Sequence, residues 1–144
     1  MYKFIFFMML NFIAPCLAQD ATRGSGSLVV FLEGFETQSG VLRIALCNSR
    51  EDYESGDQAF RSILTPVEVG TSVAIFDSLP HGEYAIKAYH DENDNEELDT
   101  NFFGAPSEAY GFSNNARGTF GPADWDDAKF FFSAQSDTIM ITLE

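Results

Sequence analysis

The sequence predicts an all-β fold: a seven-stranded antiparallel β-sandwich with one long loop. Apolar and polar residues alternate with a period of two along most of the chain beyond residue 27, as they do in strands that are buried on one face. Turn-forming residues separate these segments, and no long segment shows a helical period. Seven short strands of this kind favour two antiparallel sheets packed face to face.

The first two strands are expected at Ser27–Phe35 and Val41–Cys47. In the second strand, Leu42, Ile44 and Leu46 fall on one face, because successive side chains of a strand point to opposite sides. The residues between the two strands are typical of a turn. We therefore expect these two strands to form a β-hairpin.

A polar, turn-rich segment follows at Asn48–Arg61, and it has room for one short helical turn. Phe60 is the side chain that we expect to anchor this segment in the core. The other five strands are predicted at Ser62–Val69, Ser72–Asp77, Glu83–His90, Ala128–Ala134 and Thr138–Leu143.

The turn before the fifth strand reads Leu79-Pro80-His81-Gly82-Glu83-Tyr84. Pro80 presets the φ angle of a turn, Gly82 permits a positive φ, and Tyr84 places an aromatic ring at the sandwich edge. One face of the strand that follows carries Tyr84, Ile86, Ala88 and His90. The turn resembles the Leu-Pro-x-Gly-x-Tyr turn of transthyretin-like and carboxypeptidase-regulatory-like modules, which belong with the Ig-like sandwiches. The resemblance implies a module that binds or spaces and seldom catalyses.

The first 18 residues predict a secretory signal peptide. Lys3 supplies a positive start, Phe4–Ala14 is an apolar run, and Cys16-Leu17-Ala18 is a small-residue cleavage site. We therefore expect cleavage after Ala18 and a periplasmic or secreted protein. The apolar run is shorter than the roughly 20 residues that span a bilayer, so no transmembrane segment is expected in the mature form. A lipid-attached Cys16 is the alternative, which the residues before it disfavour.

The mature chain is expected to have a flexible leader at residues 19–26 and a single β-sandwich domain at residues 27–144. It keeps one cysteine, Cys47, so packing alone must hold the fold, and we expect this thiol to be partly buried. The full chain has a net charge of −14, and we expect no nucleic-acid partner for such an acidic protein. Solubility alone is one explanation of the charge, and attraction of cations is the functional alternative.

Residues 91–99, after the fifth strand, form an acidic segment. This acidic segment fits the first half of a calcium-loop template, in which alternate side chains turn oxygens toward a hard cation. The second half departs from it, because Glu96 replaces the template glycine and Phe102 replaces the bidentate glutamate. The flanking helices of an EF-hand are also missing. We therefore predict a looser calcium loop on a β scaffold, with a solvated acidic turn as the alternative. The predicted calcium ligands are Asp91, Asn93, Asn95, Glu97 and Asp99.

The long loop at Thr100–Asp127 is rich in aromatic residues and glycine, and loops of this length in compact domains are usually functional or disordered. One interpretation is a self-packed flap, in which Ser113, Asn114 and Asn115 satisfy backbone groups and Arg117 pairs with Asp99 or Asp91. The other is a ligand surface, in which aromatic rings stack on a sugar or peptide and amides orient it. Its predicted residues are Tyr110, Asn114, Asn115, Arg117 and Trp125.

We expect no catalytic activity. His90 and Asp91 are neighbours on a strand and therefore point to opposite faces, which does not suit a base and its orienting carboxylate. We expect His90 instead to be a half-buried residue that ties down the acidic segment. The segment Gly111–Asn115 lacks the second glycine of a nucleophile elbow, and the cysteine and histidines show no zinc-ligand spacing.

Four segments together resemble one bacterial exported family, catalogued as domain of unknown function 2141. They read GVLRIALCNS, LPHGEYAIKAYHDEN, LDTNFFGAPSEAYGFSNNARGTFGP and TIMITL. The resemblance covers nearly everything from Ser27 to Glu144. It implies export and a β-sandwich, and it carries over no catalytic residue.

The function expected from the sequence is that of an exported, non-catalytic domain that binds a ligand or a protein and has a calcium-assisted acidic loop. Its partner would be an extracytoplasmic ligand or an envelope protein. A purely structural cell-envelope protein is one alternative, and a hydrolase of unknown substrate is the other.

Overall fold

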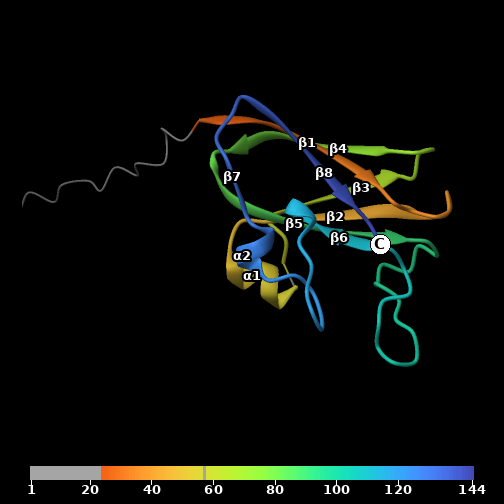
Figure 1. Ribbon diagram of the computed structural model, residues 1–144. Coiled ribbons are helices and arrows are strands. Elements are labelled where there is room, and N and C mark those ends of the chain that lie inside the picture. The colour runs from red at the N-terminus through yellow and green to blue at the C-terminus, as the bar shows by residue number, and fades with distance from the viewer. Residues whose placement is uncertain (1–23, 57) are drawn as a thin grey trace, which may run out of the picture.

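The protein is a β-sandwich of two sheets in the computed structural model, which describes residues 24–56 and 58–144 (Figure 1). The predicted signal peptide and the first part of the predicted leader lie outside the described residues. Ser25 and Gly26, which were expected in that leader, open strand β1 instead. In the described part of the chain, no helix has the length and apolar character needed to cross a bilayer.

The smaller sheet has three strands, in the order β4-β1-β8. Strand β1 (Ser25–Glu33) lies in the centre, antiparallel to β4 (Ser72–Pro80). It is parallel to β8 (Ser136–Thr142). The prediction of an entirely antiparallel sandwich is therefore wrong for the pair of β1 and β8. Strand β8 is the last in the chain, and the long connection before it, which contains β7, lets β8 run in the same direction as β1.

The larger sheet has the order β3-β2-β5-β6, with β7 paired to the start of β5. All of its pairs are antiparallel. Seven predicted strands are present, and an eighth, β6, lies within the predicted long loop. The strands of this sheet are β2 (Val41–Cys47), β3 (Arg61–Pro66), β5 (Gly82–Asp91), β6 (Tyr110–Phe112) and β7 (Phe130–Phe132).

The predicted hairpin of the first two strands is wrong, because β1 and β2 belong to different sheets. The connection crosses between the sheets at two glycines with positive φ, Gly34 (94°) and Gly40 (72°). A Cβ at Gly34 would lie 2.2 Å from the Leu143 carbonyl oxygen, and one at Gly40 would lie 1.9 Å from that of Asp91. Only glycine fits this close backbone approach.

The core between the sheets contains the side chains that the alternation predicted for β2 and β5, and Tyr84, Ile86, Ala88 and His90 are all buried. The turn before β5 forms without a positive φ at Gly82, and the positive φ falls on Ser78 (52°). The largest buried apolar side chains of the core are Phe76, Phe132, Leu28, Leu32, Leu42, Ile44, Leu46, Leu79, Ile86, Ile141 and Leu143.

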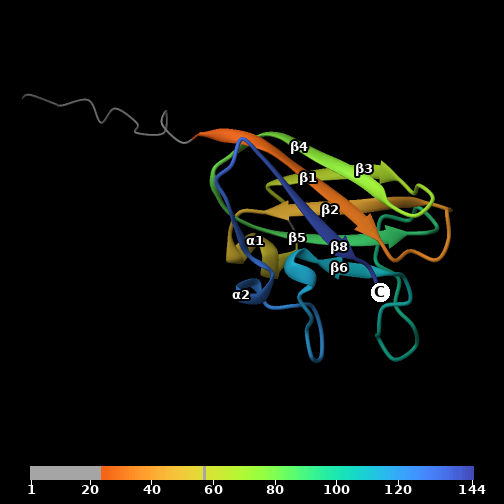
Figure 2. The same ribbon diagram turned by 45° about the horizontal axis from the view of Figure 1, so that its top comes forward.

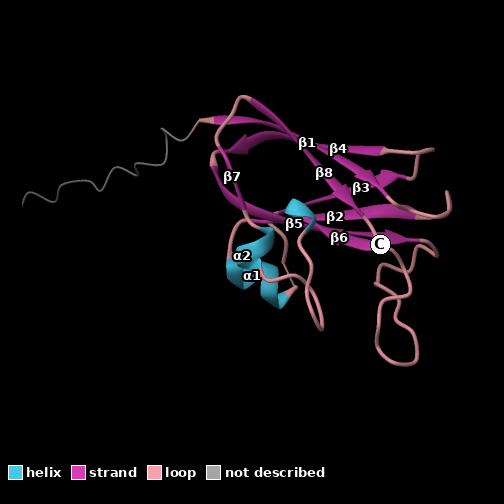
Figure 3. Ribbon diagram, viewed as in Figure 1, coloured by secondary structure: helices cyan, strands magenta, loops and turns pink. Residues whose placement is uncertain are grey.

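Three short helices gather at one end of the molecule (Figure 3). They are α1 (Arg50–Ser55), η1 (Ser113–Asn115) and α2 (Trp125–Ala128). Helix α1 confirms the predicted helical turn, but its anchor is Tyr53, which is buried, rather than Phe60, which is 39% exposed. Phe60 lies instead against the ring of Tyr84.

A second apolar cluster covers one end of the larger sheet on its outer face, and we call it the outer cluster. Cys47 and Ala85 face each other across β2 and β5 and are both buried beneath α1 and α2. The predicted partly buried Cys47 is thus almost fully buried. The members of the outer cluster are Cys47, Tyr53, Ala85, Phe112, Ala123, Trp125 and Ala128.

Ser113 ties the long loop to β5. Its Oγ accepts a hydrogen bond from the Ile86 amide (2.8 Å) and donates one to the Ala128 carbonyl (2.6 Å). Both bonds are buried, so loss of the hydroxyl would leave two backbone groups without these partners.

We expect Ser113→Ala to lower the free energy of unfolding by about 1 to 3 kcal/mol, the cost of leaving the buried Ile86 amide unsatisfied. The Ala128 carbonyl would keep the bond from Asn114. Urea unfolding followed by circular dichroism measures this loss. Ser136→Ala, at an exposed position of β8, is the matched control and should change stability little. Equal stability of the two variants would contradict the role assigned to Ser113.

Candidate functional site

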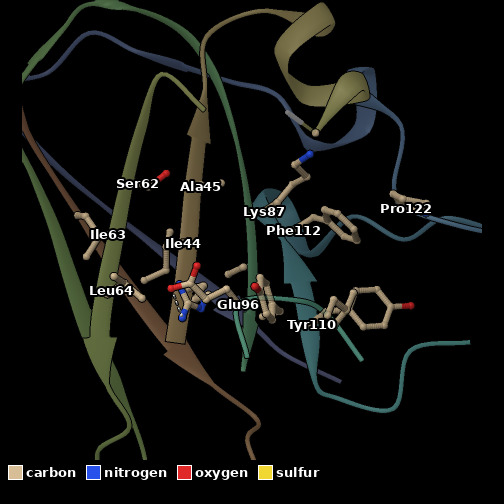
Figure 4. A pocket seen from close by; sticks show the side chains of 15 residues that line it. Ile44, Ala45, Ser62, Ile63, Leu64, Lys87, Glu96, Tyr110, Phe112 and Pro122 are labelled. Carbon is tan, nitrogen blue, oxygen red and sulfur yellow. Dashed lines mark ion pairs between the residues drawn. The ribbon is translucent and has the colours of Figure 1, made fainter. Parts of the chain in front are cut away.

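A groove of about 710 Å³ lies on the outer face of the larger sheet (Figure 4). The outer cluster borders it at one end, and the acidic segment borders it at the other. We call it the outer-face groove. Its lining residues are Arg43, Ile44, Ala45, Gly56, Ser62, Ile63, Leu64, Lys87, Ala88, Tyr89, Glu96, Leu98, Tyr110, Phe112 and Pro122.

Two rows of side chains cross the strands in this groove. The first row runs through Ser62, Ala45, Lys87 and Phe112, each paired with the next across neighbouring strands. Ser62 and Ala45 have short side chains, so the floor of the groove lies close to the backbone of β3 and β2 at these positions. It gives the groove its depth on that side.

The second row runs through Leu64, Arg43, Tyr89 and Tyr110 in the same way. Two tyrosines on adjacent strands place apolar ring surface and hydroxyl groups side by side. Leu64 is 61% exposed, although it is a large apolar side chain. The second row is therefore an amphipathic surface open to solvent.

Lys87 lies at the wall between the groove and α1. Its Nζ donates a hydrogen bond to the Tyr53 carbonyl (2.7 Å) and lies 5.1 Å from the centre of the Tyr53 ring. Burial raises the pKa of the nearby Cys47 thiol, and Lys87 only partly opposes this effect. Cys47 is thus held as a neutral thiol, as expected of a packing residue rather than a nucleophile.

Arg43 holds the acidic segment over the other end of the groove. Its Nε donates to Asp91 Oδ2 (2.6 Å), and its Nη2 pairs with Asp94 (3.0 Å) and Glu96 (3.7 Å). The predicted pairing of Arg117 with Asp99 or Asp91 is wrong, because Arg43 of the neighbouring strand β2 pairs with Asp91 and the amides of Asn93 and Asn95 bind Asp99. Arg117 pairs with Glu144 at the C-terminus.

Asp91 is fully buried and remains well hydrogen-bonded. Its carboxylate accepts from Arg43 and from the amides of Asn95 (3.0 Å) and Glu96 (2.9 Å). Burial alone would raise the pKa of this carboxyl, but the Arg43 bond and the two amides outweigh burial, so the pKa is lowered. The folded loop therefore stabilises the charged form of the Asp91 carboxyl group.

Three of the other predicted calcium ligands are hydrogen-bonded to one another. Asn93 and Asn95 donate from their Nδ2 atoms to the two oxygens of Asp99, at 2.7 and 3.0 Å, while Glu97 is exposed. Within residues 24–56 and 58–144, no three His, Cys, Asp or Glu side chains form a group that could hold a metal ion. Calcium binding stays a prediction.

Glu108 binds the backbone at both ends of the acidic segment, and sequence reasoning did not predict this role. The side chain is 7% exposed, and its two oxygens accept from the amides of Glu92 and Asp99, at 2.9 Å each. The carboxylate thus closes the loop between β5 and β6. Its position 16 residues after Glu92 gave no local signal of this contact.

The predicted ligand residues of the long loop mostly have partners within the protein. Asn114 donates to the Lys129 carbonyl (2.9 Å), and Asn115 accepts from the Thr142 amide (2.9 Å). Trp125 is buried in the outer cluster. These contacts confirm the part of the self-packed flap that assigned Ser113, Asn114 and Asn115 to backbone groups. Among the predicted ligand residues, Tyr110 is the one that lines the groove. A ligand role for the set stays a prediction.

His90 is fully buried rather than half-buried. Its Nε2 donates to the Ser39 carbonyl (2.6 Å), and its ring packs edge-on against Phe35. It points into the core, while Asp91 faces the outer side, as the strand alternation predicted. The contact with the acidic segment is limited to Glu92, whose carboxylate lies 3.8 Å from Nδ1.

A second hollow of about 530 Å³ adjoins the groove and shares Leu98, Tyr110, Phe112 and Pro122 with it. The two hollows form one extended surface on the β-sandwich. The fold and the site therefore define a β-sandwich domain with a groove on its outer face.

Residues 30–140 match the family described as uncharacterized protein conserved in bacteria, DUF2141. The chain belongs to this family. No match was found among curated proteins or among solved structures.

The lowered pKa of Asp91 predicts a pH dependence of stability. A lowered folded-state pKa contributes stability that is present above the unfolded value of 3.8 and is lost as the pH falls through the folded value. We expect wild type to be more stable than Asp91→Asn above pH 4, by a margin that shrinks at lower pH. Urea midpoints between pH 2 and 7 measure the margin.

Glu97→Gln removes an exposed charge from the same loop and is the control for the Asp91 variant. It should leave the stability near that of wild type across the pH range. A margin between wild type and Asp91→Asn that stays constant down to pH 2 would contradict the assignment.

Proposed function

We propose that this protein is an exported, non-catalytic domain that binds an extended ligand in the outer-face groove. The observation that carries the proposal is the groove itself. Both ends of the larger sheet's outer face are covered by the protein's own side chains, and the middle of that face is open. Concave surfaces with apolar walls and a few polar groups are the usual form of ligand sites.

The lining favours an oligosaccharide or a peptide. Tyr89 and Tyr110 offer ring faces for stacking or apolar contact, and Ser62 and the tyrosine hydroxyls offer hydrogen bonds. An open groove across four strands suits a chain laid along it better than it suits a compact cofactor. Export is supported by the N-terminal sequence, with its positive start, apolar run and small-residue cleavage site.

We expect Ser62→Phe to weaken binding by about tenfold or more, a loss of about 1.4 kcal/mol or more, because the ring would fill the low side of the groove. Fluorescently labelled protein on oligosaccharide and peptide arrays, followed by titration of the ligands that bind, measures this loss. The two arrays distinguish the two ligand classes.

Thr138→Phe is the matched control, since it adds the same ring at an exposed position of β8 on the smaller sheet. It should bind like wild type. Binding that is equally strong in wild type and Ser62→Phe would contradict the groove as the site. An absence of binding on both arrays, together with self-association in solution, would favour a structural envelope protein.

We propose calcium as an accessory ligand of the acidic segment, at Asn93, Asn95 and Asp99. The proximity of the three side chains supports this set, because the Nδ2 atoms of Asn93 and Asn95 lie 2.7 and 3.0 Å from the Asp99 oxygens. Each amide would have to turn its oxygen toward the ion. Both amide oxygens also accept backbone hydrogen bonds, from Asn95 and Glu97. Turning them toward a metal would cost these bonds, so the expected dissociation constant is weak, about 0.1 to 1 mM.

We expect 10 mM calcium to raise the melting temperature by about 5 °C or more, from mass action on a site of that affinity. Asp99→Ala should remove the shift, and Asp137→Ala, an exposed acidic residue of β8, should keep it. Differential scanning fluorimetry with calcium and with magnesium measures the shift. An unchanged wild-type melting temperature would contradict the proposed calcium site.

A further inference from the structure

Two loops project from the same side of the molecule, one between β5 and β6 and one between η1 and α2 (Figures 1 and 2). We call residues 100–107 and 118–123 the Phe-tipped loops. Phe102 and Phe103 lie at the end of the first loop, at 97% and 90% exposure. Phe120 lies at the end of the second loop and is fully exposed. Large apolar patches at the surface of a soluble domain usually mark an interaction site.

The Phe-tipped loops carry no charged residue, although the chain has 8 basic and 22 acidic residues. The hollow between the loops is lined by residues of both, including Phe103 and Phe120. None of the residues that line it is charged. The two loops thus form one continuous uncharged surface, while the rest of the protein is strongly acidic.

Part of the backbone of the first loop is paired by hydrogen bonds within the loop. The Asn101 side chain accepts from the amides of Phe103 (2.9 Å) and Ala105 (3.2 Å). The Asn101 amide donates to the Ala105 carbonyl (2.8 Å), and the Gly104 amide donates to the Asn101 carbonyl (2.9 Å). Four backbone amides and two backbone carbonyls that would oppose transfer out of water are therefore paired within the loop itself.

We propose that the Phe-tipped loops insert into the interfacial layer of a lipid bilayer with uncharged, zwitterionic headgroups. The three rings form one group, because Phe103 and Phe120 line the same hollow and the ring of Phe102 lies 5.5 Å from that of Phe103. A bilayer accepts apolar rings whose backbone needs no water. The acidic body, with Asp99, Glu108 and Asp124 next to the loops, disfavours anionic headgroups through charge repulsion.

The test is co-sedimentation of the full mature protein with phosphatidylcholine vesicles, and with vesicles that also contain phosphatidylglycerol. We expect binding to phosphatidylcholine and weaker binding as phosphatidylglycerol is added, with the difference reduced by salt. The triple variant Phe102→Ser, Phe103→Ser, Phe120→Ser should bind about a thousandfold more weakly, since each buried ring is worth roughly tenfold.

The control is the triple variant Val69→Ser, Ile75→Ser, Met140→Ser, whose residues are exposed apolar side chains away from these loops. It should bind like wild type. The phenylalanine variant should melt at the wild-type temperature, because its three rings are exposed. Ser62→Phe should keep vesicle binding, which separates this proposal from the groove.

Failure of wild type to bind either vesicle would overturn the proposal, as would equal binding by the phenylalanine variant. Wild-type self-association that is lost in the phenylalanine variant, without vesicle binding, would assign the Phe-tipped loops to a protein interface instead. Stronger binding to phosphatidylglycerol than to phosphatidylcholine would also contradict the charge argument.

Discussion

The ion pair between Arg43 and Asp91 is the interaction on which the site depends. Asp91 lies at the end of β5 with no exposure to solvent, and a buried carboxylate needs a hydrogen-bonded cation. Arg43 supplies this cation from β2 and also reaches Asp94 and Glu96. The acidic segment is thereby folded back onto the outer face of the larger sheet, where Glu96 becomes part of the groove. Without this pair, that end of the groove would have no wall.

The opposite end of the same face is closed by packing rather than by charge. Tyr53, Phe112 and Trp125 cover Cys47 and Ala85, which a bare sheet would expose. The long loop therefore completes the fold, since its polar residues bind backbone groups and its tryptophan is buried. What remains open is the middle of the face, together with the tips of two loops. Under the proposed function the groove would hold an extended ligand, and under the proposed bilayer contact the Phe-tipped loops would keep that ligand close to a membrane.

The sequence predicted the sandwich, the strand faces and the self-packed loop, because alternation and side-chain capping are local signals. It missed the pairing of β1 with β8 and the crossing at Gly34, since strand order depends on contacts far apart in the chain. For the same reason it assigned Arg117 rather than Arg43 to Asp91. The groove also escaped sequence reasoning. Ser62, Ala45, Lys87 and Tyr89 are ordinary outward residues until the order β3-β2-β5-β6 places them side by side.

The most direct test of the groove is an amide chemical-shift map of the ¹⁵N-labelled protein, titrated with an oligosaccharide or peptide that binds on the arrays. The groove account predicts that the largest shifts fall on β2, β3, β5 and β6, at residues such as Ala45, Ser62 and Tyr89, with little change in β1, β4 and β8. Shifts concentrated on the smaller sheet, with the signals of these three residues unmoved, would contradict it.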